Sequence, residues 1–210
     1  MRSQLGQIER RQKTMKELKV KLTFIEEVLG TASNNPEIHS EFIASKAPDA
    51  PSREEEVAAI GVDAVEGKSI TVFPRLDDGT PFAWDYQIKG FFKDACGMMR
   101  NVPKTESSKI KAYKKYIDGL VFVKERKIPF ENYGVIGECQ RPLRGRTAQG
   151  ERIALAHSET VQAGSELTFT IQILKDDLEK AIREWLDYGE LRGMFQWRNS
   201  GKGRFTWCEV

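Results

Sequence analysis

The last fifty residues of the chain follow an order of elements that few folds accommodate. Residues 166–173 place an apolar side chain at every second position, which predicts a half-buried strand. Residues 178–186 carry apolar side chains at helical spacing, which predicts an amphipathic helix. A glycine-rich loop follows, and the alternation around Phe205 and Trp207 predicts a last strand. A strand, a helix, a loop and a strand in this order are typical of an α+β fold.

The remainder of the chain adds the elements that such a fold needs. Alternation over residues 18–24 predicts a first strand, and apolar residues from Ile88 to Met99 form one stripe of a helix. Residues 120–123 are predicted to form a strand, and residues 128–130 a second strand that runs back beside it after a turn over 124–127. Strands over 135–143 and 151–161 flank a basic loop, which suits a protruding hairpin. We therefore predict an antiparallel sheet covered by helices on one face.

Local signals predict where several elements begin and end. Helices are expected to begin near Asn35-Pro36 and at the capping-box signature of Ser52 and Glu55. Asp118-Gly119 is interpreted as leading into a strand. Asp176 is expected to cap the last helix and Gly189 to end it.

Composition limits the class of protein. The 210 residues fit a single domain over 18–210 after a basic extension over 1–17. No apolar run is long enough to span a membrane and the first residues lack a signal-peptide core, so we expect no membrane contact and a cytoplasmic location. The three cysteines lie far apart in the sequence, so neither a disulfide framework, nor a metal site, nor a cofactor is predicted.

Charge is segregated along the chain although the net charge is only +2. Residues 1–20 hold six basic and two acidic groups, and residues 191–205 hold four basic groups and no acid. Acidic side chains gather over residues 54–56 instead. Segregation of this kind can create a basic face for nucleic acid, although solvated faces give the same pattern.

The loop before the last strand carries the chemistry of a nucleic-acid contact. Its glycines let backbone N–H groups approach phosphates, its cations neutralise them, and its tryptophan can stack on a base. The candidate residues are Arg192, Gly193, Trp197, Arg198, Gly201, Lys202, Gly203 and Arg204. The alternative is a tight connection whose aromatic side chains fill the core. Gly201-Lys202 is not followed by serine or threonine, so a nucleotide-binding phosphate loop is excluded.

The motif Ser-Glu-Thr-Val-x-Ala-Gly-Ser-x-Leu-x-Phe-x-Ile over 158–171, followed by a helix and by Gly-Lys-Gly-Arg-Phe over 201–205, resembles the RAMP superfamily of CRISPR RNA-binding proteins. The resemblance is greatest to the subunits that form the crRNA-binding backbone. It implies a ferredoxin-like, RRM-related sheet, a guide or other single-stranded RNA as partner, and self-assembly along RNA or with CRISPR effector subunits.

The same resemblance extends to two further segments. Residues 84–95 resemble the place where a Lys-Gly pair opens a helix along the guide, so Lys89, Gly90 and Arg100 are expected to face RNA. The hairpin of this family crosses the guide, which implies RNA contacts for Arg141, Arg144 and Arg146. The chain also resembles proteins carried by prophages of Gram-positive bacteria.

Departures from the family argue against catalysis. RNA-cutting backbone subunits use an aspartate in the loop after the first strand, and residues 31–36 contain none. His39 and His157 are the two histidines, distant in sequence and without a fixed partner. We therefore predict a protein that is not an enzyme. The alternatives are a phage or mobile-element protein that binds or mimics a host defence complex, with acidic residues 49–66 as its contact surface, and a metal-independent RNA endonuclease using either histidine.

Overall fold

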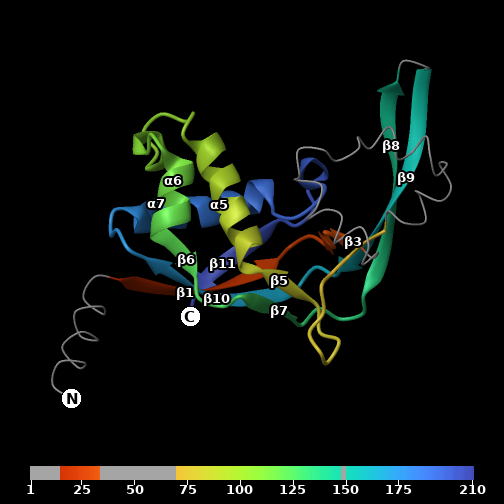
Figure 1. Cartoon of the computed structure of the whole chain (residues 1–210), viewed down its shortest axis with the longest axis horizontal. Helices are drawn as coiled ribbons and strands as arrows, with labels where there is room; N and C mark the ends of the chain where they lie inside the picture. Colours follow the sequence, from red (N-terminus) through yellow and green to blue (C-terminus); the bar gives the residue numbers. More distant parts are fainter. Residues whose placement is uncertain (1–14, 34–69, 148–149) are drawn as a thin grey trace, which may run out of the picture.

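The computed structural model describes residues 15–33, 70–147 and 150–210 (Figure 1). The predicted helices beginning near Asn35 and Ser52, the acidic segment 49–66, His39 and most of the basic extension lie outside the described residues.

The main sheet is antiparallel and has the strand order β11-β1-β10-β7-β5, with β6 pairing beside β10. Its strands are β1 (Lys16–Phe24), β5 (Phe82–Trp84), β6 (Val121–Val123), β7 (Lys127–Glu131), β10 (Glu166–Ile173) and β11 (Phe205–Glu209). Taken with the intervening helices, β1, β6–β7, β10 and β11 are the four strands of a ferredoxin-like unit in the spatial order four, one, three, two. The predicted α+β class is confirmed.

Three helices cover one face of this sheet (Figure 1). They are α5 (Asp85–Met99), α6 (Tyr113–Leu120) and α7 (Leu178–Arg192), and short 3₁₀ turns lie at η1 (Ser107–Lys109) and η2 (Arg198–Ser200). The alternating apolar residues of β1 and β10 are buried against the helical stripes of α5 and α7, as the periodicity predicts. No helix in the described part of the chain is long and apolar enough to cross a membrane.

A long hairpin is inserted between the second and third strands of the ferredoxin-like unit and projects from the body (Figure 1). Strands β8 (Gly137–Thr147) and β9 (Gly150–Val161) pair from Gly137↔Thr160 to Thr147↔Gly150. At its base β9 pairs with β2 (Val28–Leu29) and β4 (Thr71–Val72), and β4 pairs with β3 (Ala32–Ser33). The protruding hairpin is confirmed, but the predicted basic loop is wrong, because most of its residues extend the two strands.

Two predictions for residues 113–131 are wrong. Asp118 and Gly119 lie within α6, because Tyr113, Ile117 and Leu120 form a short helical stripe against the core. Residues 124–127 do not turn the chain back, since β6 and β7 pair with opposite ends of the same strand, β10. Between β6 and β7, the Glu125 carboxylate accepts hydrogen bonds from the Thr170 backbone N–H (2.7 Å) and hydroxyl (3.0 Å). These bonds take the place of the strand-to-strand hydrogen bonds that are interrupted there.

The predicted ends of α7 are also shifted. Asp177, not Asp176, occupies the N-cap, and its side chain makes no capping hydrogen bond. Gly189 lies inside the helix, where a Cβ would come within 2.1 Å of the Phe205 ring. Gly193 ends the helix instead, with a φ of 71°. Gly189 therefore serves close packing and Gly193 serves the change of direction.

Candidate nucleic-acid interface

The glycine-rich loop, residues 193–204, connects α7 to the edge strand β11 and is held by backbone hydrogen bonds. Met194 N–H donates to the Gly203 carbonyl (3.0 Å), and Gly203 N–H donates to the Glu27 carbonyl (2.9 Å). Phe195 and Trp197 both have positive φ, at 66° and 54°, which is uncommon for aromatic residues. The loop is therefore a fixed structure whose backbone sets the directions of its aromatic side chains.

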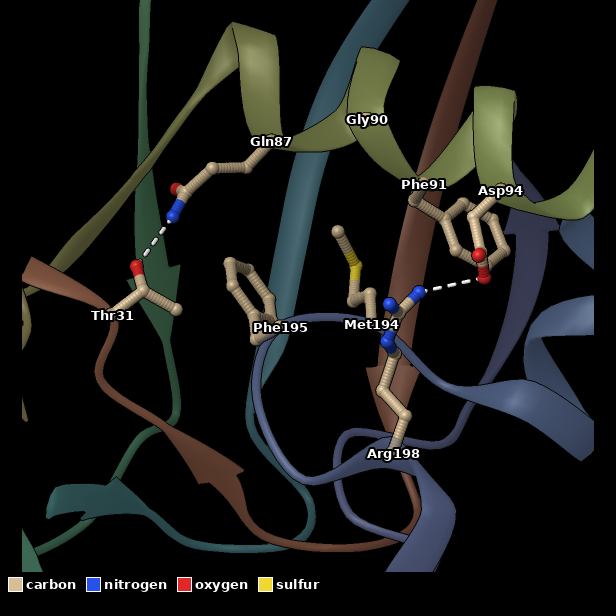
Figure 2. Close-up of a pocket in the computed structure, with 8 residues that line it drawn as sticks. All are labelled: Thr31, Gln87, Gly90, Phe91, Asp94, Met194, Phe195 and Arg198. Atoms are coloured by element: carbon tan, nitrogen blue, oxygen red, sulfur yellow. Dashed lines mark hydrogen bonds and ion pairs between the residues drawn. The ribbon is translucent and has the colours of Figure 1, made fainter. Parts of the chain in front are cut away.

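A cavity of about 380 Å³ lies between this loop and the first half of α5 (Figure 2). Apolar side chains form its centre, and polar groups stand at both ends: Gln87 Nε2 donates to Thr31 Oγ1 at one end (2.7 Å), and Arg198 binds Asp94 at the other (2.6 Å). Its lining residues are Thr31, Gln87, Gly90, Phe91, Asp94, Met194, Phe195 and Arg198. An apolar floor with polar ends suits a flat ligand that has hydrogen-bonding edges.

Three cations of this surface are paired with acids of the same chain: Arg192 at the end of α7, and Arg198 and Lys202 in the loop. One Asp94 carboxylate oxygen accepts from Arg192 Nε (3.2 Å) and from Arg198 Nη1 (2.6 Å). Lys202 Nζ lies 2.6 Å from Glu27 Oε1, and this hydrogen bond raises the pKa of Lys202. The arginine side chains remain about a quarter exposed, and each guanidinium keeps donors that Asp94 does not use.

The base of the hairpin meets the loop through Arg141, which is 8% exposed. Its Nη2 donates to Gln196 Oε1 (3.0 Å), and its guanidinium carbon lies 4.8 Å from the centre of the Trp197 ring. Among the residues that the structure describes, Nε and Nη1 of Arg141 are buried and have no hydrogen-bond partner. A buried guanidinium with two unused donors is a strong potential contact for an anion.

Most of the predicted site residues converge at this end of the molecule. Gly90 and Arg198 line the cavity, Arg192 binds the lining residue Asp94, and Arg141 meets Trp197 at the hairpin base. The other candidates lie in the same loop without lining the cavity, and Gly193 and Gly203 are buried. Arg204 lies in this group too, with Nε donating to the Glu190 carbonyl (2.6 Å). The structure therefore brings the loop, the hairpin base and α5 together, as a single binding surface requires.

Four predicted residues lie elsewhere or are described only in part. Lys89 points away, donating to the Asp118 carbonyl (3.1 Å) over the Phe122 ring, and partial burial lowers its pKa. Lys89 and Gly90 lie in the second turn of α5 instead of opening it. Arg100 caps the far end of that helix, about 15 Å along its axis from Gly90. Arg144 and Arg146 lie on β8, opposite Ile153 and Glu151.

Several residues of this surface are not among the sequence predictions. Asp94 is one polar position of an amphipathic helix, and Gln87 accepts a hydrogen bond from the Trp84 N–H at its start (2.8 Å). Gln196 Nε2 donates to the Gly30 carbonyl (2.9 Å), which ties the loop to the segment after β2. Gln87 could have been predicted from its position three residues after the N-cap Trp84, because a glutamine at N3 often accepts a hydrogen bond from the N-cap backbone.

The sheet face opposite the helices is polar along its two central strands. Its side chains there are Lys19, Lys21, Thr23, Thr168, Thr170 and Gln172. RRM domains stack bases on aromatic residues of this face. Strands β1 and β10 place no aromatic residue on this face.

His157 lies on β9 and lines a second cavity, of about 170 Å³, together with Glu138 and Glu159. Within residues 15–33, 70–147 and 150–210, no three His, Cys, Asp or Glu side chains gather as a metal site.

These features define a ferredoxin-like α+β protein with a glycine-rich loop before its last strand and a hairpin inserted between its second and third strands. The sequence matches no protein-family model and no curated protein.

The structure is similar to a chain in the cryo-EM structure of "the Type III-B Cmr-beta bound to cognate target RNA". The identity is 12%, the TM-score is 0.53, and the match covers 99% of this chain and 64% of that chain. The protein thus spans less than two thirds of its structural relative. At this identity the likeness concerns the fold, and it agrees with the RAMP-like fold that the sequence motifs imply.

Proposed function

We propose that the protein binds single-stranded or guide RNA without cutting it, and that the glycine-rich loop and the base of the hairpin form the grip. Phosphates would contact the cations of this surface, while Trp197 offers a ring for stacking. The protein would act as one subunit along an RNA or within a CRISPR-type effector complex.

The observation that carries this proposal is the convergence of Arg141, Arg192 and Arg198 around the glycine-rich loop, where Arg141 binds Gln196 and the other two bind Asp94. They come from β8, α7 and the loop, segments far apart in the sequence. Arg141 keeps two buried donors that no described residue accepts from, and a ligand with acceptor oxygens would satisfy them. A phosphodiester supplies acceptor oxygens and negative charge together.

The structural relative gives the proposal its context. It belongs to a Type III-B Cmr-beta complex bound to cognate target RNA, and its fold is similar to that of this chain. The loop and the cavity of this chain support an RNA contact, and the relative supports the choice of RNA over other polyanions.

Fluorescence anisotropy of labelled single-stranded RNA, titrated at several salt concentrations, tests the grip. The Arg198→Ala/Lys202→Ala variant should bind more weakly than wild type. Its plot of log affinity against log salt should be less steep by about 1.4, since each lost phosphate contact contributes about 0.7 on single strands. The matched control is Lys111→Ala/Lys115→Ala, which removes two exposed charges beside or on α6. Equal binding by wild type and the loop variant would contradict the proposal.

The absence of cutting is tested with the same RNA, labelled at one end and incubated with wild-type protein, with and without Mg²⁺. We expect intact RNA on a denaturing gel. Products that disappear in a His157→Ala variant would favour the endonuclease alternative instead.

One observation favours the second candidate, a mobile-element protein that binds a host defence complex through protein contacts. Arg192 at the end of α7 and the loop cations Arg198 and Lys202 already have acidic partners in this chain, as expected of a RAMP-like fold that does not need RNA. A pull-down from host lysate with nuclease treatment distinguishes the two. A protein partner that survives nuclease, with no RNA affinity in the purified protein, would favour this candidate.

A further inference from the structure

A second surface outside the loop combines a series of aromatic rings, whose outermost member is exposed, with two cations. It is formed by Phe82, Trp84 and Tyr86, where the edge strand β5 runs into α5, and by Arg126 and Lys127 at the start of β7. We refer to these five residues as the edge platform. In Figure 1, β5 lies at the margin of the main sheet and leads directly into α5.

The three rings form a continuous series. Phe82 packs edge-to-face against Trp84, with 4.8 Å between ring centres. Trp84 and Tyr86 are nearly parallel, at an interplanar angle of 16° and a distance of 6.1 Å. Phe82 is buried, Trp84 is partly exposed and Tyr86 is 54% exposed, so the series runs from the core to the solvent.

Two cations lie on these rings. The Arg126 guanidinium carbon is 5.2 Å from the centre of Trp84 and 5.9 Å from that of Tyr86, and Asp85 binds the same guanidinium. Lys127 Nζ lies 5.3 Å from the centre of Phe82 and 5.9 Å from that of Trp84. The Arg126 side chain is 66% exposed, so most of its donors face solvent.

This arrangement selects the chemistry of its ligand. A cationic ligand, the usual occupant of an aromatic cage, would be repelled by the two cations already on the rings. An exposed ring flanked by an arginine and a lysine instead suits a flat base joined to a phosphate, because the base stacks and the cations neutralise the phosphate. Protein interfaces also use tryptophan, tyrosine and arginine, but among the described residues Asp85 is the one acid bound to the platform's two cations, which favours a polyanion.

We propose that the edge platform is a base-stacking subsite for single-stranded RNA, in which Tyr86 stacks on a base and Arg126 contacts an adjacent phosphate. This inference rests on the proposed function, because it extends the same RNA beyond the loop. The two surfaces meet at the first turns of α5: Gln87 accepts from the Trp84 N–H and lines the cavity of the loop. Gly90 lies one turn further along α5 and also lines the cavity. It is exposed, and no atom lies within 4 Å of the position that a Cβ would take, so an RNA strand can lie close to the helix there.

The test uses the exposed Tyr86 and the full-length protein. Tyr86→Leu removes the ring and keeps an apolar side chain, and Tyr86→Phe keeps the ring. Because one stacked base contributes about 1–3 kcal/mol, we expect Tyr86→Leu to weaken binding of a labelled uridine oligomer about tenfold and Tyr86→Phe to bind like wild type. An abasic strand of equal length should bind wild type and Tyr86→Leu equally, since the platform would have no base to hold. Thermal melts of both variants verify that each is folded.

Cross-linking locates the contact independently. A 4-thiouridine strand irradiated on wild type should label the tryptic peptide over residues 76–89, which contains all three rings, as well as the loop peptide over 193–198. Labelling of the loop peptide alone, or wild-type affinity in Tyr86→Leu, would overturn the subsite while leaving the grip of the loop intact. Absence of any RNA binding by wild type would overturn the proposed function itself. Loss of a nuclease-resistant protein partner in Tyr86→Leu, with RNA affinity unchanged, would identify the platform as a protein interface and overturn the subsite.

Discussion

Gly201 and Gly203 lie two residues apart in the glycine-rich loop and share a left-handed backbone, with φ of 83° and 70°. Their surroundings differ. A Cβ on Gly203 would come within 2.1 Å of the Met194 carbonyl oxygen, whereas on Gly201 the nearest atom lies 3.8 Å away, in the flexible Arg204 side chain. The pair therefore separates the effect of backbone strain from that of steric overlap.

We expect Gly201→Ala to lower the free energy of unfolding by about 1 kcal/mol, because an alanine at positive φ is strained. Gly203→Ala should lower it by about 3 kcal/mol or more, since the loop backbone must also move away from Met194. Urea denaturation followed by circular dichroism measures both. Equal losses would mean that the loop adjusts freely and is not the fixed structure described above.

Asp94 controls how much positive charge the loop presents, because one of its oxygens binds both Arg192 and Arg198. Asp94→Asn removes the negative charge while keeping an oxygen that can accept one of these hydrogen bonds. If RNA binds here, its affinity should rise about twofold to fivefold at low salt, and the gain should shrink as salt is added.

Asp77→Asn is the matched control, since it removes one exposed carboxylate in a turn outside the loop. Anisotropy titrations at two salt concentrations measure both variants. A fall in affinity for Asp94→Asn alone would show that Asp94 orients the arginines more than it competes with phosphate.

Residue identity and spacing predict which residues of the loop belong to this surface, but not the acids and amides with which they are paired. The glycines, arginines and tryptophan of the loop are adjacent in the sequence, so their common chemistry is evident there. The partners Asp94, Glu27 and Gln87 come from α5 and from the segment after β1, and each is an ordinary polar residue of its own element. Only the packing of α5 beside the loop distinguishes Asp94 from other acids, and that packing is set by the whole core.

At the scale of elements, periodicity predicts best where a buried stripe is long. The strands over 18–24 and 166–173 and the stripes of α5 and α7 are confirmed because each buries at least four apolar side chains. Helix α6 was missed because its eight residues bury only Ile117 fully, while Gly119 suggests a turn. The continuation of β6 into β7 depends on Glu125 reaching Thr170 across the sheet, which a local pattern cannot indicate.

The pairing of β1 with β10 includes an acid whose ionisation should be linked to folding. Lys21, Asn132 and Thr23 hydrogen-bond to Glu166, and the Lys21 ammonium contributes most to lowering the pKa of that carboxyl. A carboxyl whose pKa is lower in the folded state stabilises the fold above its unfolded-state pKa of about 4.3. That contribution is lost as the pH falls through the lowered folded-state pKa.

Glu166→Gln should therefore be less stable than wild type at neutral pH, and the difference should disappear in acid. Urea midpoints measured between pH 7 and pH 2.5 test this expectation. The effect should also shrink in high salt, because the pair lies near the surface. A difference that persists below the folded-state pKa would assign the loss to packing instead of charge.

At the scale of the whole molecule, the chain divides into a packed body and a projecting hairpin (Figure 1). The body places the loop beside the first turns of α5, and the hairpin base contacts the loop through Arg141, so three separate sequence regions contribute to one surface. Along the hairpin, residues 142–147 and 150–155 pair only with one another among the described strands, and the ties to β2 and β4 begin at Ser158. The outer hairpin is therefore expected to contribute little to the stability of the body.

Replacing residues 142–155 with Asn-Gly tests this division, because a two-residue turn suits the facing pair Arg141 and Ala156. We expect the melting temperature to change by no more than about 5 °C, since no strand of the main sheet loses a partner. RNA affinity should fall about tenfold at low salt, because Arg144 and Arg146 are removed with the outer hairpin. Arg144→Ala/Arg146→Ala in the full-length hairpin should reproduce most of that loss if charge is responsible. Unfolding of the truncated protein would show that the hairpin stabilises the body. Wild-type RNA affinity in the truncated protein would exclude the outer hairpin from the RNA surface, and the loop and Arg141 alone would then bind the RNA.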